Sequence, residues 1–128
     1  MDRSEFEELV DHSDAVSEPV PITEAVLETL GESLAAGQAE AVAKWLPDEY
    51  AETLTAPGGE AESLSAEDFT DRVRERLDER GAESDGEILA RAGAVTDALA
   101  TTVPHDELLD LRSQLPDRIG SLFTGGVR

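Results

Sequence analysis

AVLETLGESLAAGQAEAVAKWLPDEY, residues 25–50, returns 69 residues later as AVTDALATTVPHDELLDLRSQLPDRI, residues 94–119. The two stretches align without a gap, so that Leu46-Pro47-Asp48 meets Leu115-Pro116-Asp117. Identical and apolar residues match at helical spacing through the whole alignment of residues 25–54 with 94–123. A match of this kind predicts that the chain contains two copies of one helical module.

Apolar residues recur three and four positions apart along most of the chain, and no stretch shows the sustained alternation of a strand. The pattern predicts an all-α fold, a single helical bundle of about eight short helices in one domain. The first module spans residues 4–54, a small and polar connector follows at 55–64, the second module spans 65–123, and 124–128 form a tail. Neither module has a large core alone, so packing of their inner faces about a pseudo-two-fold axis is the simplest way to complete one.

Prolines, glycines and capping residues predict where the helices begin and end. Pro19 and Pro21 predict an extended linker over residues 11–21, with the next helix beginning at residue 22. Gly37 stands where that helix is expected to end, and Pro47 separates the two helices that follow. Ser65-Ala66-Glu67-Asp68 has the form of a capping box, which is expected to open the first helix of the second module.

The composition is strongly acidic, with 30 acidic and 10 basic residues and a net charge of −20. Its hydrophobic residues are mostly small, and only one of its basic residues is a lysine. This combination is typical of haloarchaeal proteins in a cytoplasm of molar salt, where charge repulsion is screened over about 3 Å at 1 M ionic strength. The alternative is that the acidity serves a basic partner. Either way, nucleic-acid binding through a broad basic patch is disfavoured.

An arginine stripe is the one concentrated cationic feature of the chain. Arg72, Arg76 and Arg80 recur every four residues, so they share one helix face beside an apolar stripe. Three interpretations are open. The stripe binds an anionic partner, or it pairs with acids on its own helix such as Asp68, or it meets the acidic first module.

Trp45 is the only tryptophan, and it stands where the second module has Gln114. The module therefore does not require an aromatic residue at this position. Two interpretations remain open: Trp45 anchors an interface with a partner, or it covers a seam between helices. Together with the arginine stripe it forms the candidate interaction surface: Trp45, Arg72, Arg76 and Arg80.

The residues do not form a recognisable catalytic or metal-binding pattern. His12 and His105 are the only histidines, and both are expected to be solvated. The chain has no cysteine, no Gly-x-Ser-x-Gly turn and no phosphate-binding loop. A calcium loop over residues 78–89 fails because Leu89 stands where the bidentate glutamate belongs. We therefore expect no enzyme activity, no cofactor and no specific metal, although a pocket joining a histidine to several carboxylates would revive an enzyme hypothesis.

One helix pattern of the second module resembles a known family. It runs from Asp68-Phe69 through Ala94-Val95 and Leu99 to Gln114-Leu115-Pro116 and Leu122-Phe123, and it resembles the domain-of-unknown-function family 2267. The first module matches the same pattern from AVLETLGESL to KWLPDEY, so that the two cover most of the chain. The resemblance implies that this chain is one of the small acidic helical proteins found in haloarchaea and actinobacteria. The resemblance implies a helical fold and carries over no activity and no catalytic residues.

The remaining expectations concern location and function. The first residues lack the apolar run of a secretory signal, and no stretch has the roughly 18 apolar residues of a membrane span. A cytoplasmic protein without membrane contact is therefore expected. Strong helix signatures without a chemical site favour a non-catalytic module that binds another protein or itself at high salt. The alternative is an acidic decoy that binds a basic nucleic-acid-binding protein.

Overall fold

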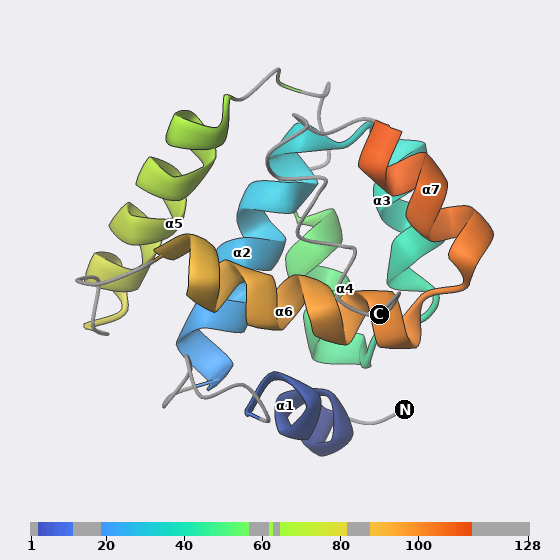
Figure 1. The fold of residues 1–128 in the computed structure, drawn as a ribbon, viewed down its shortest axis with the longest axis horizontal. Helices are drawn as coiled ribbons and strands as arrows, with labels where there is room; N and C mark the ends of the chain where they lie inside the picture. The colour runs from blue at the N-terminus through green and yellow to red at the C-terminus, as the bar shows by residue number, and fades with distance from the viewer. Residues whose placement is uncertain (1–2, 12–18, 57–61, 63–64, 82–87, 114–128) are drawn as a thin grey trace.

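The computed structural model describes residues 3–11, 19–56, 62, 65–81 and 88–113. These residues form an all-α bundle, and none of them lies in a strand (Figure 1). The helices are α1 (Arg3–Asp11), α2 (Pro19–Ser33), α3 (Ala36–Ala43), α4 (Asp48–Thr55), α5 (Ala66–Glu79), α6 (Ile88–Thr102) and α7 (His105–Ser113). The last expected helix, most of the connector and the tail lie outside the described residues.

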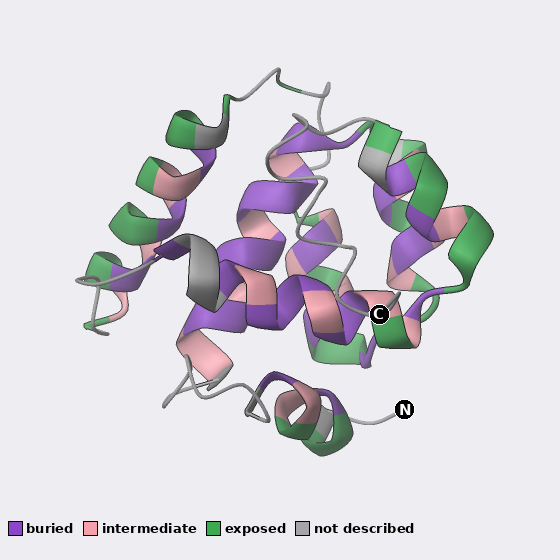
Figure 2. Cartoon of the chain, in the orientation of Figure 1, coloured by how far each residue is buried: buried purple, intermediate pink, exposed green. Residues whose placement is uncertain are grey.

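The two longest helices, α2 and α6, form the centre of the bundle. α2 contacts α1, α4, α5 and α6, and Figure 1 shows α6 crossing it. Both central helices are buried along most of their length, whereas α5 and α7 each present an exposed outer face (Figure 2). One apolar core joins all the described helices, and its largest fully buried side chains are Tyr50, Phe6, Phe69, Ile22, Leu27, Leu30, Leu34, Leu54, Leu77, Leu99 and Leu111.

Helix bounds and burial follow the 69-residue spacing of the sequence match. α2 and α6 each contain 15 residues and begin 69 positions apart, and α3 and α7 begin at the same spacing. Gln38 of α3 donates a hydrogen bond from Nε2 to Glu107 Oε2 of α7 at 3.3 Å, so two matched positions also meet in space. The matched core positions are buried in both halves: Ala25 and Ala94, Val26 and Val95, Leu30 and Leu99, Val42 and Leu111.

The first helix of each half lies mainly against the central helix of the other half. α1 packs chiefly on α6, and α5 packs chiefly on α2. Phe6 and Val10 anchor α1 in the core, and the Phe6 ring lies 5.4 Å from the Tyr50 ring of α4. Tyr50 also donates a hydrogen bond from its hydroxyl to Glu7 Oε1 at 2.9 Å. The two halves therefore interlock, because each supplies a helix to the core of the other.

The prediction of an extended linker over residues 11–21 is wrong for residues 19–21, which are helical. α2 begins at Pro19 and includes Pro21, so both prolines belong to its first turn. The first four N–H groups of a helix have no partner within it, and a proline ring there meets no preceding turn. Proline therefore costs little at these positions, although it would break the helix further along. Residues 12–18 of the expected linker lie outside the described residues.

Gly37 does not end the helix before it. α2 ends at Ser33, the chain turns through Ala35 with φ −62° and ψ 147°, and Gly37 lies in the first turn of α3. A glycine ends a helix by taking a positive φ, and among the described glycines only Gly81 does so, at 67°. Gly81 follows α5 directly after the C-cap residue Arg80.

Candidate functional site

α5 carries the arginine stripe, and its own sequence fixes where it begins. Ser65 Oγ accepts a hydrogen bond from Asp68 N at 3.1 Å, and Ser65 N donates to Asp68 Oδ2 at 3.4 Å. The expected capping box is thereby confirmed. The helix buries an apolar stripe against α2 and α6: Phe69, Val73 and Leu77. This packing turns the adjacent arginine side chains toward α2.

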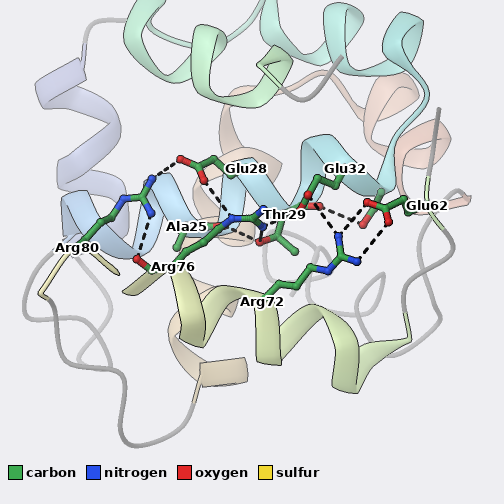
Figure 3. A network of polar contacts seen from close by, with 9 residues as sticks. Ala25, Glu28, Thr29, Glu32, Glu62, Arg72, Arg76 and Arg80 are labelled. Carbon is green, nitrogen blue, oxygen red and sulfur yellow. Dashed lines mark hydrogen bonds and ion pairs between the residues drawn. The ribbon is translucent and has the colours of Figure 1, made fainter. Parts of the chain in front are cut away.

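The first two arginines of the stripe reach across to glutamates of α2 and of the connector (Figure 3). Arg72 Nη1 lies 2.9 Å from Glu62 Oε2 and 3.3 Å from Glu32 Oε2. Arg76 Nη1 lies 2.6 Å from Glu32 Oε1, and Arg76 Nε lies 3.1 Å from Glu28 Oε2. Glu32 is therefore shared between two guanidinium groups.

Arg80 completes the series near the start of α2. Its guanidinium pairs with Glu28, and its Nε lies 3.7 Å from Glu24 Oε1. The arginine numbers fall as the glutamate numbers rise, so α2 and α5 run antiparallel and each arginine bridges two carboxylates. We refer to this network as the arginine–glutamate ladder: Arg72, Arg76 and Arg80 with Glu24, Glu28, Glu32 and Glu62.

A buried hydroxyl of α2 holds the middle of the ladder. Thr29 is fully buried, and its Oγ1 donates to Ala25 O at 2.8 Å while accepting a hydrogen bond from Arg76 Nη1 at 2.7 Å. Arg76 thus contacts Thr29, Glu28 and Glu32 with one planar group. A guanidinium offers five donors in fixed directions, whereas a lysine ammonium is a single point charge. The middle position of the ladder therefore favours arginine over lysine.

Glu62 attaches the connector to the same network. Its N donates to Glu32 O at 2.9 Å, and this carbonyl is one of the last four of α2, which have no partner within the helix. The Glu62 carboxylate accepts two hydrogen bonds from Arg72, at 2.9 Å from Nη1 and 3.3 Å from Nη2. Glu62 therefore contacts α2 through its backbone and α5 through its side chain.

The ladder shifts the pKa of two of its members, Glu32 and Arg72. Burial alone would raise the pKa of Glu32, but the hydrogen bond and charge of Arg76, with a further contribution from Arg72, hold that pKa below its ordinary value. The hydrogen bond to Glu62 raises the pKa of Arg72 despite an opposing effect of burial. The arginine side chains of the ladder are only 20–33% exposed, so their pairs are screened less than fully exposed ones.

We expect the stabilising contribution of Glu32 to be lost in acid. Its folded-state pKa lies below the ordinary value of 4.5, so the contribution is present above that value and disappears as the pH falls through the folded-state pKa. Denaturation of the wild type and Glu32→Gln at constant KCl, from about pH 7 to about pH 3, measures this effect. The wild type should be the more stable at neutral pH, and the two stabilities should converge in acid.

Glu40→Gln is the matched control for this experiment, since Glu40 is an exposed acid of α3 outside the ladder. It should keep the pH dependence of the wild type. A stability difference between the wild type and Glu32→Gln that stays constant into acid would contradict the expectation.

The arginine stripe meets the acidic first module, which is the third interpretation of the sequence pattern. The expected pair between Asp68 and Arg72 does not form, because Asp68 caps α5 while Arg72 reaches Glu62 and Glu32. Arg74 pairs within α5, with Asp71 at 3.6 Å. The guanidinium groups of the stripe are engaged inside the chain, so they are not open to an anionic partner in this structure.

The signal that identifies the partner of the stripe is present in the sequence. Glu24, Glu28 and Glu32 recur every four residues, with the same period as the arginines. Two helices that carry opposite charges at one spacing are suited to pair along their length. Sequence reasoning found the arginines and missed these glutamates.

Trp45 lies away from the ladder, directly after α3. It is 46% exposed, and Lys44 beside it is exposed and pairs with none of the described carboxylates. Leu109 of α7 is the other large hydrophobic residue that is exposed in the described part of the chain, at 47%. Sequence reasoning missed Leu109, although its matched position in the first module is the exposed acid Glu40. α3 and α7 contact each other, so Leu109 lies on one helix of this pair and Trp45 lies two residues beyond the end of the other.

Histidines and carboxylates do not gather into a site within the described residues. His105 is exposed at the start of α7, and His12 lies outside the described residues. No group of three or more histidine, aspartate or glutamate residues in the described part is placed to hold a metal ion. None of the helices described here combines the length and apolar character needed to cross a membrane.

A family model described as "Uncharacterized conserved protein (DUF2267)" matches residues 5–122. The chain belongs to the DUF2267 family. The match includes both halves of the bundle and confirms the family resemblance of the helix pattern. No curated protein matches the chain. The description of DUF2267 names no activity.

Proposed function

We propose that this DUF2267 protein is a non-catalytic helical module that binds another protein or a second copy of itself. The observation that carries the proposal is the exposure of Trp45, just after α3, and of Leu109 on α7, since the other large hydrophobic residues in the described part of the chain are buried or half-buried. Tryptophan is enriched among the residues that dominate binding energy at protein interfaces. An exposed aromatic residue that the module itself does not require fits such a role.

The proposed setting is a cytoplasm that holds molar salt. Support comes from the net charge of −20, which in dilute buffer would repel both within the chain and between copies. At 1 M ionic strength this repulsion is screened over about 3 Å. Long-range charge attraction is screened as well, so an interface in this medium depends chiefly on close apolar contact.

The proposal also includes two tandem copies of one helical module. The matching bounds of α2 with α6 and of α3 with α7 support it. Further support comes from the reciprocal packing, in which α1 lies on α6 and α5 lies on α2. Such an arrangement is expected when two similar modules pack about a pseudo-two-fold axis.

Molecular mass and capture in molar KCl test the proposal. We expect the full chain to elute above the mass of one copy, or to capture a protein partner that molar salt does not release. Trp45→Gln, which installs the residue found at the matched position, should weaken either association. A strict monomer that captures no protein would count against the proposed function.

A second candidate function is an acidic decoy that binds a basic nucleic-acid-binding protein. One observation favours it: the ladder engages the arginines of α5, and the outer face of that helix exposes several acids, namely Glu67, Asp71, Glu75, Asp78 and Glu79. A decoy should be displaced by nucleic acid and should bind more weakly as salt rises. Binding that is insensitive to competing nucleic acid would exclude this candidate.

A further inference from the structure

We infer that two copies of this chain pair through α3 and α7, with Trp45 and Lys44 of one copy meeting Leu109 and its flanking acids on the other. The inference rests on the proposed function and names its surface and its partner, a second copy of the chain. We refer to Lys44 and Trp45 as the aromatic patch, and to Asp106, Leu109 and Asp110 as the aliphatic patch.

Both apolar residues differ from their counterparts in the sequence repeat. Trp45 stands where the second module has Gln114, and Leu109 stands where the first module has the exposed Glu40. The repeated sequence therefore does not require an apolar residue at either position. In a chain with a net charge of −20, two large hydrophobic residues about half exposed are not explained by the core of the bundle. Burying them in an interface would remove their apolar area from water.

The two patches carry complementary charges. Lys44 is the only lysine of the chain, it is exposed beside Trp45, and none of the described carboxylates pairs with it. Asp106, three residues before Leu109 on α7, and Asp110, the residue after it, are both exposed acids. An aromatic patch against an aromatic patch would bring two lysines together, and an aliphatic patch against an aliphatic patch would bring four acids together. Opposite pairing avoids both costs.

The aromatic patch directly follows the end of α3, and the aliphatic patch lies on the neighbouring helix α7. α3 and α7 contact each other, and Gln38 and Glu107 join them through a hydrogen bond of 3.3 Å. A two-fold axis between copies brings a residue i of one chain to a residue j of the other and, reciprocally, j to i. Both patches of each copy are then engaged at once, and the contact closes at a dimer.

Sedimentation equilibrium of the full chain in molar KCl tests the surface. The variants are Trp45→Gln and Leu109→Glu, each of which installs the residue of the other module at an exposed position. By circular dichroism, each variant should have the same helicity and the same unfolding temperature as the wild type. We expect the wild type to dimerise, and each variant to raise the dimer dissociation constant by about tenfold or more.

An equimolar mixture of the two variants tests the pairing itself. A Trp45→Gln dimer has no intact contact between Trp45 and Leu109, and neither has a Leu109→Glu dimer. A mixed dimer retains one such contact. We therefore expect the mixture to dimerise more tightly than either variant alone. A mixture that associates no better than its components would overturn the cross-pairing of the two patches.

The other outcomes separate this inference from the proposed function. A wild type that is monomeric at every accessible concentration overturns the inference, while a different protein partner would still satisfy the proposed function. A dimer that forms equally well in the wild type and in both variants overturns this surface, while the proposed self-association stands.

Discussion

Truncating Leu30 to alanine is expected to lower the free energy of unfolding by about 3 kcal/mol, and Leu99→Ala by a similar amount. Leu30 is 1% exposed in α2, and Leu99 is fully buried in α6. The two changes remove the same atoms from matched positions of the central helices, and each leaves a cavity in the core. Chemical denaturation in molar KCl measures both losses. Glu52→Ala is the control, because Glu52 is exposed on α4, outside the core, the ladder and the α3–α7 pair, and its truncation should change the free energy of unfolding by less than about 0.5 kcal/mol.

The informative result of this experiment is the difference between the free-energy losses of Leu30→Ala and Leu99→Ala. Similar losses at Leu30 and Leu99 would support equivalent roles for α2 and α6. If one truncation unfolds the chain and the other is tolerated, the two central helices do not share the core as their matched burial indicates.

Helical periodicity predicted the fold class because α2, α5 and α6 each carry an apolar stripe long enough to show the period. The periodicity does not specify which helix buries which stripe, so the reciprocal packing of α1 on α6 and α5 on α2 became visible only in the structure. The start of α2 was misplaced for another reason. Proline is excluded from a helix interior but tolerated in the first turn, and the sequence around Pro19 and Pro21 does not distinguish the two.

Replacing Arg76 by methionine is expected to lower the free energy of unfolding by about 2 kcal/mol. The change keeps most of the side-chain length but removes the group that contacts Thr29, Glu28 and Glu32. Two carboxylates of α2 would then share a partly buried position with less compensating charge. Arg76→Lys should lose an intermediate amount, because lysine restores the charge without the planar set of donors.

Arg74→Met is the matched control for Arg76→Met on the same helix. Arg74 pairs with Asp71, and the two side chains are 45% and 69% exposed. An exposed pair of this kind contributes at most about 0.5 kcal/mol. Denaturation in molar KCl compares the two variants directly. A loss at Arg74 that equals or exceeds the loss at Arg76 would show that the ladder does not hold α5 on α2.

The candidate site was predicted in part. The four-residue spacing of the arginines correctly placed their side chains on one face of α5, but a single helix cannot show whether its charged face meets solvent, a partner or another helix. The answer required the antiparallel contact with Glu24, Glu28 and Glu32. Trp45 is a candidate from the sequence because its matched residue, Gln114, is polar. Leu109 satisfies the same criterion against Glu40, and a complete comparison of the two modules would have found it.

We propose that the acidity of the chain is an adaptation to molar salt rather than a binding surface. Thermal unfolding followed by far-ultraviolet circular dichroism, from dilute buffer to several molar KCl, tests it most directly. We expect helicity or unfolding temperature to fall sharply in dilute buffer, because the net charge of −20 is then unscreened. A chain that is fully helical and equally stable in dilute buffer would contradict the claim and favour the acidic decoy.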